Sequence, residues 1–383
     1  TPNALVTTPT DSRTTHVGLA ASYGRLELLE RFRRLDPETL DRANPASQAK
    51  TYPLHRAVWA QAEAVDFLLR HGVTATARDR DGKGWPAIAA PIQRGELSIF
   101  HKLLEAARRE RGEEPLEAVL AGPQGYTLLH VCAQFNRVDM ARTLIEVHRF
   151  DPLAAEDQWR WQPIHFAAHH NARDAWRFFS GFTSGPALVE ANRTDLHIAA
   201  SNGAKSVLDE ILLAYETQTI DAVDTDGRTP LHAAAAGHHP ACVHALLAWM
   251  NPNSATAKAD GRFTALHSAL KLPPGATNAD APSYEDDVLA TVEVLLKDPR
   301  TDVNIPDRRG HSPLAAAALF PKVQKLLLDH AELDLSASIA NRQAPAYVLA
   351  ARLGHWRAFH RYLEQHDPPA EPDLDGRGNG FLH

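Results

Sequence analysis

The sequence predicts an all-α repeat solenoid of about ten helix-turn-helix units joined by hairpins, with a truncated eleventh unit at the C-terminus. Three observations support this prediction. One short phrase recurs along the chain at a nearly constant interval, a second helical run follows each copy, and a polar turn precedes it. A chain that repeats at a period of about 20 to 50 residues folds as stacked units, each of which contacts only its neighbours.

The recurring phrase has the form Thr-Pro-Leu-His followed by small residues. Its clearest copy is Thr229–Ala235, and Thr194–Ala200 and Gln162–Ala168 are close to it. Shorter copies begin at Tyr52, Thr127 and Thr264, and weaker ones place Gly18, Ala89, Ala315 and Val348 where the histidine would stand. Most of these histidine positions follow one another at intervals of 32 to 37 residues.

The pattern resembles the T-P-L-H-x-A-A signature of ankyrin repeats, whose period is about 33 residues. The resemblance covers nearly the whole chain. It extends to the polar turn of the form D-x-x-G-x before the phrase, as in Asp224–Arg228 and Asp307–His311. It implies stacked helix pairs, and it implies that the phrase histidine bonds to backbone in the turn. We therefore interpret the many histidines as structural rather than as metal ligands.

Each part of the unit has a physical reason. Proline, as at Pro230, fits the first helical turn because the N–H groups of that turn have no partner within the helix. A threonine before it, as at Thr229, can cap those donors. The pair Ala234–Ala235 lets neighbouring helices approach closely. A second helix then ends in paired leucines, as in Cys242–Leu247.

Two longer intervals indicate insertions. The 48-residue interval contains Leu272–Asp287, rich in proline, acidic and small residues, and we expect an exposed loop between the two helices of the eighth repeat. The 41-residue interval contains Glu113–Pro115 and predicts a longer helix and connector. Neither insertion begins a new domain, so we expect a single array over residues 1–383. Residues 376–383 restart the phrase, which predicts that the natural chain continues into a further repeat.

Composition narrows the function classes. The formal net charge of −7 disfavours a general nucleic-acid binder, because such proteins neutralise phosphates with clustered cations. No run of about 18 apolar residues predicts a membrane span. The two cysteines, Cys132 and Cys242, lie in apolar helical patterns and are predicted to be buried thiols. We expect an intracellular protein, in cytoplasm or nucleus, or a delivered effector.

Aromatic residues stand at the positions that contact partners in the family the chain resembles. In that family, partners bind the concave face, which consists of hairpin ends and first helices. The candidates in the N-terminal half are Trp59, Trp85, Tyr126, Phe135, Trp159 and Trp161. Aromatic side chains often carry several kcal/mol of interface energy, so these residues are candidate anchors. The alternative is that some of them pack against adjacent hairpins.

Basic residues occupy the same positions from the sixth repeat onward. They are Arg193, Arg228, Arg308, Arg309, His311 and Arg352, with Arg262 nearby. Such a line of cations predicts a partner with an acidic segment, although solvated turn residues would give the same pattern. The pairs His169–His170 and His238–His239 lie at turns between helices, with His169 and His170 at variable positions, and partner contact or solvent exposure fits both pairs better than a metal site.

No catalytic pattern was found. The chain has no nucleophile elbow, phosphate loop or H-E-x-x-H helix, and the glycine-rich segment Gly376–Gly380 coincides with a repeat hairpin. We therefore expect a non-catalytic module that needs no cofactor and binds a protein or peptide. The alternative is an internal scaffold or autoinhibitory arm, which binds other domains of the same larger chain. Fold alone cannot choose between these roles.

Overall fold

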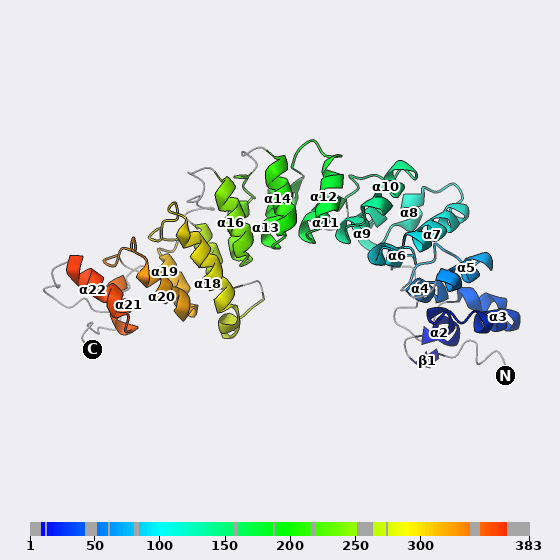
Figure 1. Ribbon diagram of the computed structural model, residues 1–383, viewed down its shortest axis with the longest axis horizontal. Coiled ribbons are helices and arrows are strands. Elements are labelled where there is room, and N and C mark those ends of the chain that lie inside the picture. The colour runs from blue at the N-terminus through cyan, green and yellow to red at the C-terminus, as the bar shows by residue number, and fades with distance from the viewer. Residues whose placement is uncertain are drawn as a thin grey trace. The chain divides into compact units, whose positions relative to one another are not determined.

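The structure is a computed structural model. It describes residues 9–11, 14–42, 52–59, 62–79, 84–155, 160–186, 188–215, 220–250, 263–272, 275–337 and 345–365. The chain divides into two compact units, Thr1–Ser184 and Gly185–His383. Each unit is a succession of helix pairs (Figure 1).

Unit 1 contains five helix pairs among its described residues. They are α2 (His16–Ser22) with α3 (Leu26–Leu35), α4 (Pro53–Ala57) with α5 (Ala62–Arg70), α6 (Ala89–Arg94) with α7 (Leu97–Glu110), α9 (Leu128–Gln134) with α10 (Val138–Glu146), and α11 (Pro163–His169) with α12 (Arg173–Ser180). The shorter elements are β1 (Pro9–Asp11), which pairs antiparallel with β2 (Thr14–Thr15), and η1 (Pro37–Asp41), α8 (Leu116–Leu120) and η3 (Pro123–Gly125).

Unit 2 also contains five helix pairs in the part of the chain that is described. They are α13 (Asp195–Ser201) with α14 (Lys205–Ala214), α15 (Pro230–Ala236) with α16 (Pro240–Trp249), α17 (Ala265–Ala269) with α18 (Ala281–Lys297), α19 (Pro313–Ala316) with α20 (Pro321–Asp329), and α21 (Ala346–Arg352) with α22 (Trp356–Gln365). Its shorter elements are η4 (Glu190–Asn192), η6 (Asn278–Asp280), η7 (Ala317–Leu319), and β3 (Leu188–Val189), which pairs antiparallel with β4 (Arg193–Thr194).

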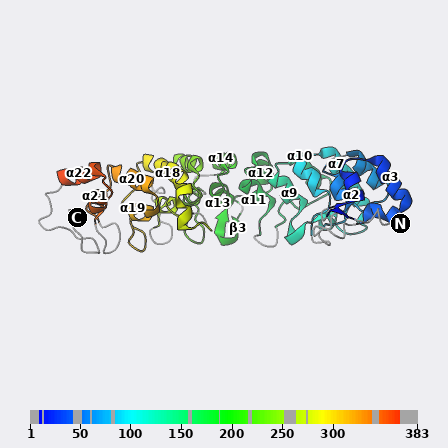
Figure 2. The ribbon, with the colours of Figure 1, turned by 90° about the horizontal axis from the view of Figure 1, so that it is seen from below.

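Within a unit, the first helices of the pairs pack on one another, and so do the second helices. In unit 2, α13, α15, α17 and α19 form one row of contacts, and α14, α16, α18, α20 and α22 form the other. Figure 2 shows these rows, with α13, α19 and α21 on the side of β3 and α14, α18 and α22 on the opposite side. The all-α repeat prediction is thereby confirmed.

Small residues fill the first-helix row. Ala199, Ala200, Ala234 and Ala235 are completely buried, as expected where helix backbones approach closely. Larger apolar side chains from the second helices complete the core, for example Val243 and Leu246 of α16.

The phrase histidine caps its own helix. His232 is the third residue of α15, and its Nδ1 accepts the backbone N–H of Thr229 at 3.3 Å. The same reciprocal cap occurs at Thr127 with His130, Gln162 with His165, Thr194 with His197, and Thr264 with His267. These bonds satisfy helix N-terminal donors that would otherwise lack partners.

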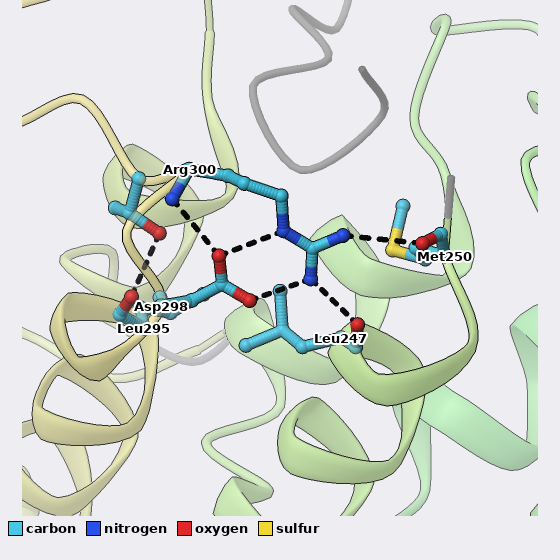
Figure 3. Close-up of polar contacts among 6 residues, drawn as sticks. Leu247, Met250, Leu295, Asp298 and Arg300 are labelled. Atoms are coloured by element: carbon cyan, nitrogen blue, oxygen red, sulfur yellow. Dashed lines mark hydrogen bonds and ion pairs between the residues drawn. The ribbon is translucent and has the colours of Figure 1, made fainter. Parts of the chain in front are cut away.

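Arginines from other repeats hold the ends of helices. Arg300 lies after α18, and its guanidinium donates to the carbonyl oxygens of Leu247 at 2.6 Å and Met250 at 3.1 Å, at the end of α16 (Figure 3). Asp298 holds this guanidinium in a two-bond ion pair at 2.8 Å and 2.5 Å. Arg137 likewise donates to carbonyls at the end of α6. These arginines therefore stabilise the stack.

The insertion at Leu272–Asp287 differs from the loop that the sequence predicts. Residues 278–280 form η6, and residues 281–287 form the first turns of α18. Two local signals explain the helix. Pro282 stands in its first turn, where no N–H is needed, and the Asp280 carboxylate accepts the N–H of Thr277 at 2.8 Å just before it. The loop is therefore shorter than predicted, and the insertion mainly lengthens the second helix of its pair.

The second predicted insertion, around Glu113–Pro115, follows the 14-residue helix α7 and precedes the short helix α8.

Residues 376–383 lie outside the described part of the chain. The further repeat therefore stays a prediction, as does the single array over residues 1–383. None of the described helices combines the length and the apolar character that crossing a bilayer requires.

Candidate binding surface

In five places among the described residues, the residue just before a helical phrase is attached to the preceding repeat by that repeat's histidine. His130 Nε2 lies 2.9 Å from the carbonyl oxygen of Trp161, and His197 Nε2 lies 3.0 Å from that of Arg228. The same contact joins His55 to Trp85, His232 to Phe263, and His267 to His311. In the four histidines whose Nδ1 accepts the cap hydrogen bond, namely His130, His197, His232 and His267, Nε2 carries the proton and donates to the carbonyl. The histidines thus position the backbone of the predicted contact residues.

In unit 1, several predicted contact residues form an aromatic cluster with one another. Its members are Trp85, Tyr126, Trp161, Phe166, His169 and His170. Trp85 meets Tyr126 edge-on at 6.5 Å between ring centroids, and Tyr126 meets Phe166 edge-on at 5.3 Å. The centroid of the Trp161 ring lies 5.6 Å from that of Phe166 and 5.5 Å from that of His169. Edge-to-face contacts of this kind stabilise the rings that make them.

The predicted aromatic anchors therefore differ in how much surface they offer. Trp85, Tyr126, Phe135 and Trp161 are half-buried, whereas Trp59 is 50% exposed. Trp85 also packs so closely on Gly122 that a β-carbon there would overlap the indole. Trp159 lies outside the described residues. Of the described aromatic candidates, Trp59 offers the largest exposed fraction.

The histidine pair at the end of α11 belongs to the cluster. His169 and His170 lie 4.6 Å apart between ring centroids, and His170 stacks on Phe166 at 6.5 Å. His170 is exposed on the surface and His169 is half-buried. Partial burial lowers the pKa of His170, and the neighbouring His169 lowers it further. No group of three or more potential metal ligands occurs among the described residues.

A second histidine pair, expected at a solvent-exposed or partner-facing turn, has a structural role. His238 is buried, and its Nε2 lies 3.0 Å from the carbonyl oxygen of Ala269 in the next repeat. His239 Nε2 lies 3.2 Å from the carbonyl oxygen of Ser201 in the preceding repeat. The two side chains therefore connect α15 to both neighbours. Solvent exposure was the wrong expectation for His238, because the stacking of repeats covers this turn.

In unit 2, the predicted basic residues of successive repeats border one depression. We define the basic groove by Arg193, Arg228, Lys271, Arg308 and Arg309. One part of it, of about 450 Å³, is lined by Arg193, Arg228 and Lys271 together with Ala233, Ala236 and Phe263. The adjoining part, of about 390 Å³, shares Arg228, Phe263 and Lys271 and adds Arg308 and Arg309. The arginines come from hairpins, Lys271 follows α17, and the small residues Ala233 and Ala236 belong to α15.

The side chains of the basic groove interact with one another and with nearby carboxylates. Burial lowers the pKa of Arg193, Asp224 raises it, and the positive charge of Arg228 lowers it further. Arg228 forms an exposed ion pair with Asp226 at 3.0 Å. Lys271 holds its ammonium 3.8 Å from the centroid of the Phe263 ring, a cation–π contact. Exposed ion pairs of this kind contribute little to stability.

The remaining predicted residues lie at different distances from this groove. Arg308 and Arg309 are exposed and line its second part, whereas His311 is half-buried with Nδ1 3.6 Å from an Asp307 carboxylate oxygen. Arg352 is exposed at the end of α21 and does not line the groove. Arg262 lies outside the described residues. The structure thus brings four of the predicted basic residues together and leaves Arg352 apart.

Three residues that shape these surfaces escaped the sequence analysis. Phe166 is buried and links the aromatic cluster, and Phe263 and Lys271 line the basic groove. Phe263 stands directly before its phrase, the same place as Arg228 in the preceding repeat, so the repeat pattern could have identified it. Lys271 follows α17, and only the packing of repeats places it beside the hairpins.

Comparison with known proteins supports the repeat assignment. A family profile described as "Ankyrin repeats (3 copies)" matches residues 189–279, and one described as "Ankyrin repeat" matches residues 124–154. These segments contain the histidine-capped helices α9, α13, α15 and α17. The chain is an ankyrin-repeat protein. Ankyrin repeats generally mediate protein–protein interactions, and ankyrin-repeat proteins are typically non-catalytic.

One relative and one solved structure that are similar to this chain also have ankyrin repeats in their names. Over 123 residues, the ankyrin-repeat chain is 31% identical to "Ankyrin repeat domain-containing protein SAT10" of Stachybotrys chartarum. This match covers 32% of the present chain and 6% of that relative, so the chain spans only a small part of the relative's length. Among solved structures, the human ASB11 ankyrin repeat domain aligns with a TM-score of 0.49 and 17% identity, covering 64% of this chain and 98% of that one.

Proposed function

We propose that this ankyrin-repeat chain is a non-catalytic module that binds a protein or peptide with an acidic segment, on the face made by its hairpin ends and first helices. This is the face that the repeat pattern predicts to be concave. One observation carries the proposal: basic residues from successive repeats, Arg193, Arg228 and Arg308–Arg309, line a common groove in unit 2. A linear acidic segment could contact them in sequence, gaining association rate and specificity.

The aromatic residues of unit 1 also support the proposal that the chain binds a protein or peptide. Trp59 is half-exposed, and the edges of the aromatic cluster are half-buried. Such residues can contribute apolar contact area to a partner while remaining packed on one side. We propose Trp59 as the principal aromatic anchor and the cluster as a further preformed surface of the same unit.

The proposal is tested by affinity capture with two matched variants of the 383-residue chain. Arg228→Glu/Arg309→Glu reverses two groove charges, and Lys325→Glu/Arg357→Glu reverses two exposed charges on second helices. Proteins that bind the wild-type chain and the control variant but are lost from the groove variant are the expected result. Equal capture by all three chains would refute binding at this groove. Circular dichroism verifies that each variant is folded.

A second candidate is that the same groove docks on another part of a longer polypeptide, as an internal scaffold or autoinhibitory arm. The observation that favours it is the great length of the SAT10 relative compared with the matched segment. The two candidates differ in what the 383-residue chain captures. A separate protein bound through the groove supports the first candidate, whereas binding only to other segments of its own polypeptide supports the second.

Nucleic-acid binding is a distinct alternative for the basic groove, and salt dependence separates it from protein binding. Neutralisation of several phosphates gives an affinity that falls steeply with salt concentration. We expect no measurable affinity for duplex DNA or RNA at physiological salt, because the chain has a formal net charge of −7. Tight, salt-sensitive binding of either nucleic acid would contradict this expectation.

A further inference from the structure

One part of the basic groove is a pocket with an unusual charge balance. It has a volume of about 390 Å³, and its walls come from three successive hairpins and the end of α17. We call it the Phe263 pocket. Its lining residues are Asp226, Arg228, Phe263, Lys271, Asp307, Arg308 and Arg309. Four cationic side chains face two carboxylates, which leaves an excess of two positive charges in one small volume.

Contacts within the protein hold Lys271 and Phe263 of the Phe263 pocket in place. The ammonium of Lys271 lies 3.8 Å from the centroid of the Phe263 ring. The carbonyl oxygen of Phe263 lies 3.0 Å from Nε2 of His232, so this residue is attached to the preceding repeat. Asp307 is engaged by its own turn, where its Oδ1 accepts the N–H of Arg309 and of His311 at 2.8 Å each. The pocket is therefore preformed by contacts that need no ligand.

Electrostatics in the pocket favour an incoming anion. Burial lowers the pKa of Lys271, and the positive charges of Arg228 and Arg309 lower it further, against the opposing effect of Asp307 and Asp226. The three cations therefore repel one another within reach of one cavity. A ligand with a single negative charge would offset half of the excess, and a ligand with two charges would offset all of it.

We propose that the Phe263 pocket binds a phosphorylated serine or threonine side chain of the partner. This inference rests on the proposed function, since it names the chemistry that one segment of the partner would present. A phosphate monoester carries about −1.5 to −2 charges at pH 7 and three acceptor oxygens. Guanidinium groups match these oxygens with paired donors, and the lysine adds a third cation. An aspartate or glutamate supplies one charge and fewer acceptors.

The test uses the whole 383-residue chain and three synthetic peptide pools. The pools have the same randomised flanks and differ only in a central phosphoserine, serine or aspartate. Fluorescence polarisation at constant ionic strength measures their dissociation constants. We expect the phosphoserine pool to bind about tenfold more tightly than either of the others. Equal affinity for the phosphoserine and aspartate pools, or no binding of the phosphoserine pool, would overturn the inference.

Variants locate the binding within the pocket. Lys271→Gln and Arg309→Gln are each expected to remove most of the preference for phosphoserine over serine. Arg309 is an exposed turn residue, so its replacement keeps the inference testable if Lys271→Gln disturbs packing on Phe263. Lys325→Gln removes an exposed charge on α20, in the same unit and outside the pocket, and should leave the preference unchanged. A preference that survives in both pocket variants would exclude this site.

The failure of this inference is distinguishable from failure of the proposed function. If Arg228→Glu/Arg309→Glu abolishes partner capture but the serine and phosphoserine pools bind equally, the groove binds its partner without phosphate recognition. If capture is insensitive to the groove charges and no pool binds, both the function and the inference are wrong.

Discussion

The Nε2 nitrogen of His232 lies 3.0 Å from the carbonyl oxygen of Phe263, a residue that lines the basic groove. The Nδ1 nitrogen of the same histidine accepts a hydrogen bond of 3.3 Å from the backbone N–H of Thr229, the residue that precedes α15. One buried side chain therefore joins the cap of α15 to the binding surface of the next repeat. The stability of the stack and the geometry of the groove depend on the same contact.

Replacement of His232 by alanine should lower the free energy of unfolding by about 2 kcal/mol, because the buried cap donor and the Phe263 carbonyl lose their partner. Urea denaturation followed by circular dichroism measures the change. His244→Ala alters an exposed histidine of the same helix pair and should change stability by less than about 0.5 kcal/mol. Equal losses of stability in His232→Ala and His244→Ala would show that the buried hydrogen bonds of His232 do not contribute specifically to the free energy of unfolding.

Acidification should destabilise the fold. Burial lowers the pKa of His55, His197 and His267 below the ordinary histidine value, so below about pH 6.5 the unfolded chain binds more protons than the folded one. The stability these neutral histidines contribute is present above that pH and is lost as the pH falls. The urea midpoint should be lower at pH 5.5 than at pH 7.5.

His197→Gln should reduce the difference between the two midpoints, because one of the neutral histidines is removed. The exposed control His244→Gln should leave that difference unchanged. A higher midpoint at pH 5.5 than at pH 7.5 would contradict the sign of the effect.

Arg300→Lys should destabilise the protein by about 1 to 3 kcal/mol although it keeps the charge. A lysine cannot pair with Asp298 through two bonds and also donate to the carbonyls of Leu247 and Met250. Lys297→Arg, at an exposed position just before it, serves as the matched control and should be neutral. Thermal unfolding of both variants measures the difference; a neutral Arg300→Lys would show that only the charge matters.

Trp161 and Trp59 should respond differently to replacement by alanine. Trp161 packs on Phe166 and His169, so Trp161→Ala should cost about 1 kcal/mol of stability or more. Trp59 is half-exposed, and Trp59→Ala should leave unfolding nearly unchanged while weakening partner binding. Chemical denaturation and binding assays on both variants separate the two effects. Loss of stability in Trp59→Ala without loss of binding would remove it as an anchor.

The repeat pattern alone was sufficient to predict the fold, because each unit is short and carries its own local signals. A threonine, proline and histidine at the start of a helix specify the cap, and paired alanines specify close helix packing, wherever the copies occur. The pattern failed at residues 281–287. There the acidic composition indicated a loop, but Pro282 stands in the first turn of α18, directly after the capped helix η6, and α18 packs on its neighbours.

From the sequence, we could predict which positions form the candidate surface but not how exposed their side chains are. That exposure depends on the adjoining repeats. The sequence placed Trp85, Tyr126 and Trp161 at contact positions, but packing decides that they are half-buried: Phe166 packs on Tyr126 and Trp161, and Gly122 lies against Trp85. His238 and Arg300 resemble ordinary polar turn residues until a neighbouring repeat supplies the carbonyl that each one binds.

By itself, the sequence of this protein determined which elements form and in which order they stack, since caps, helix periodicity and hairpin turns are local properties. Only the tertiary structure decided which side chains meet. Lys271 faces Arg228 and Arg309 because three repeats bring their hairpins to one cavity. Burial and Coulomb interactions between residues far apart in the sequence arise from that packing, and the periodic pattern does not encode them.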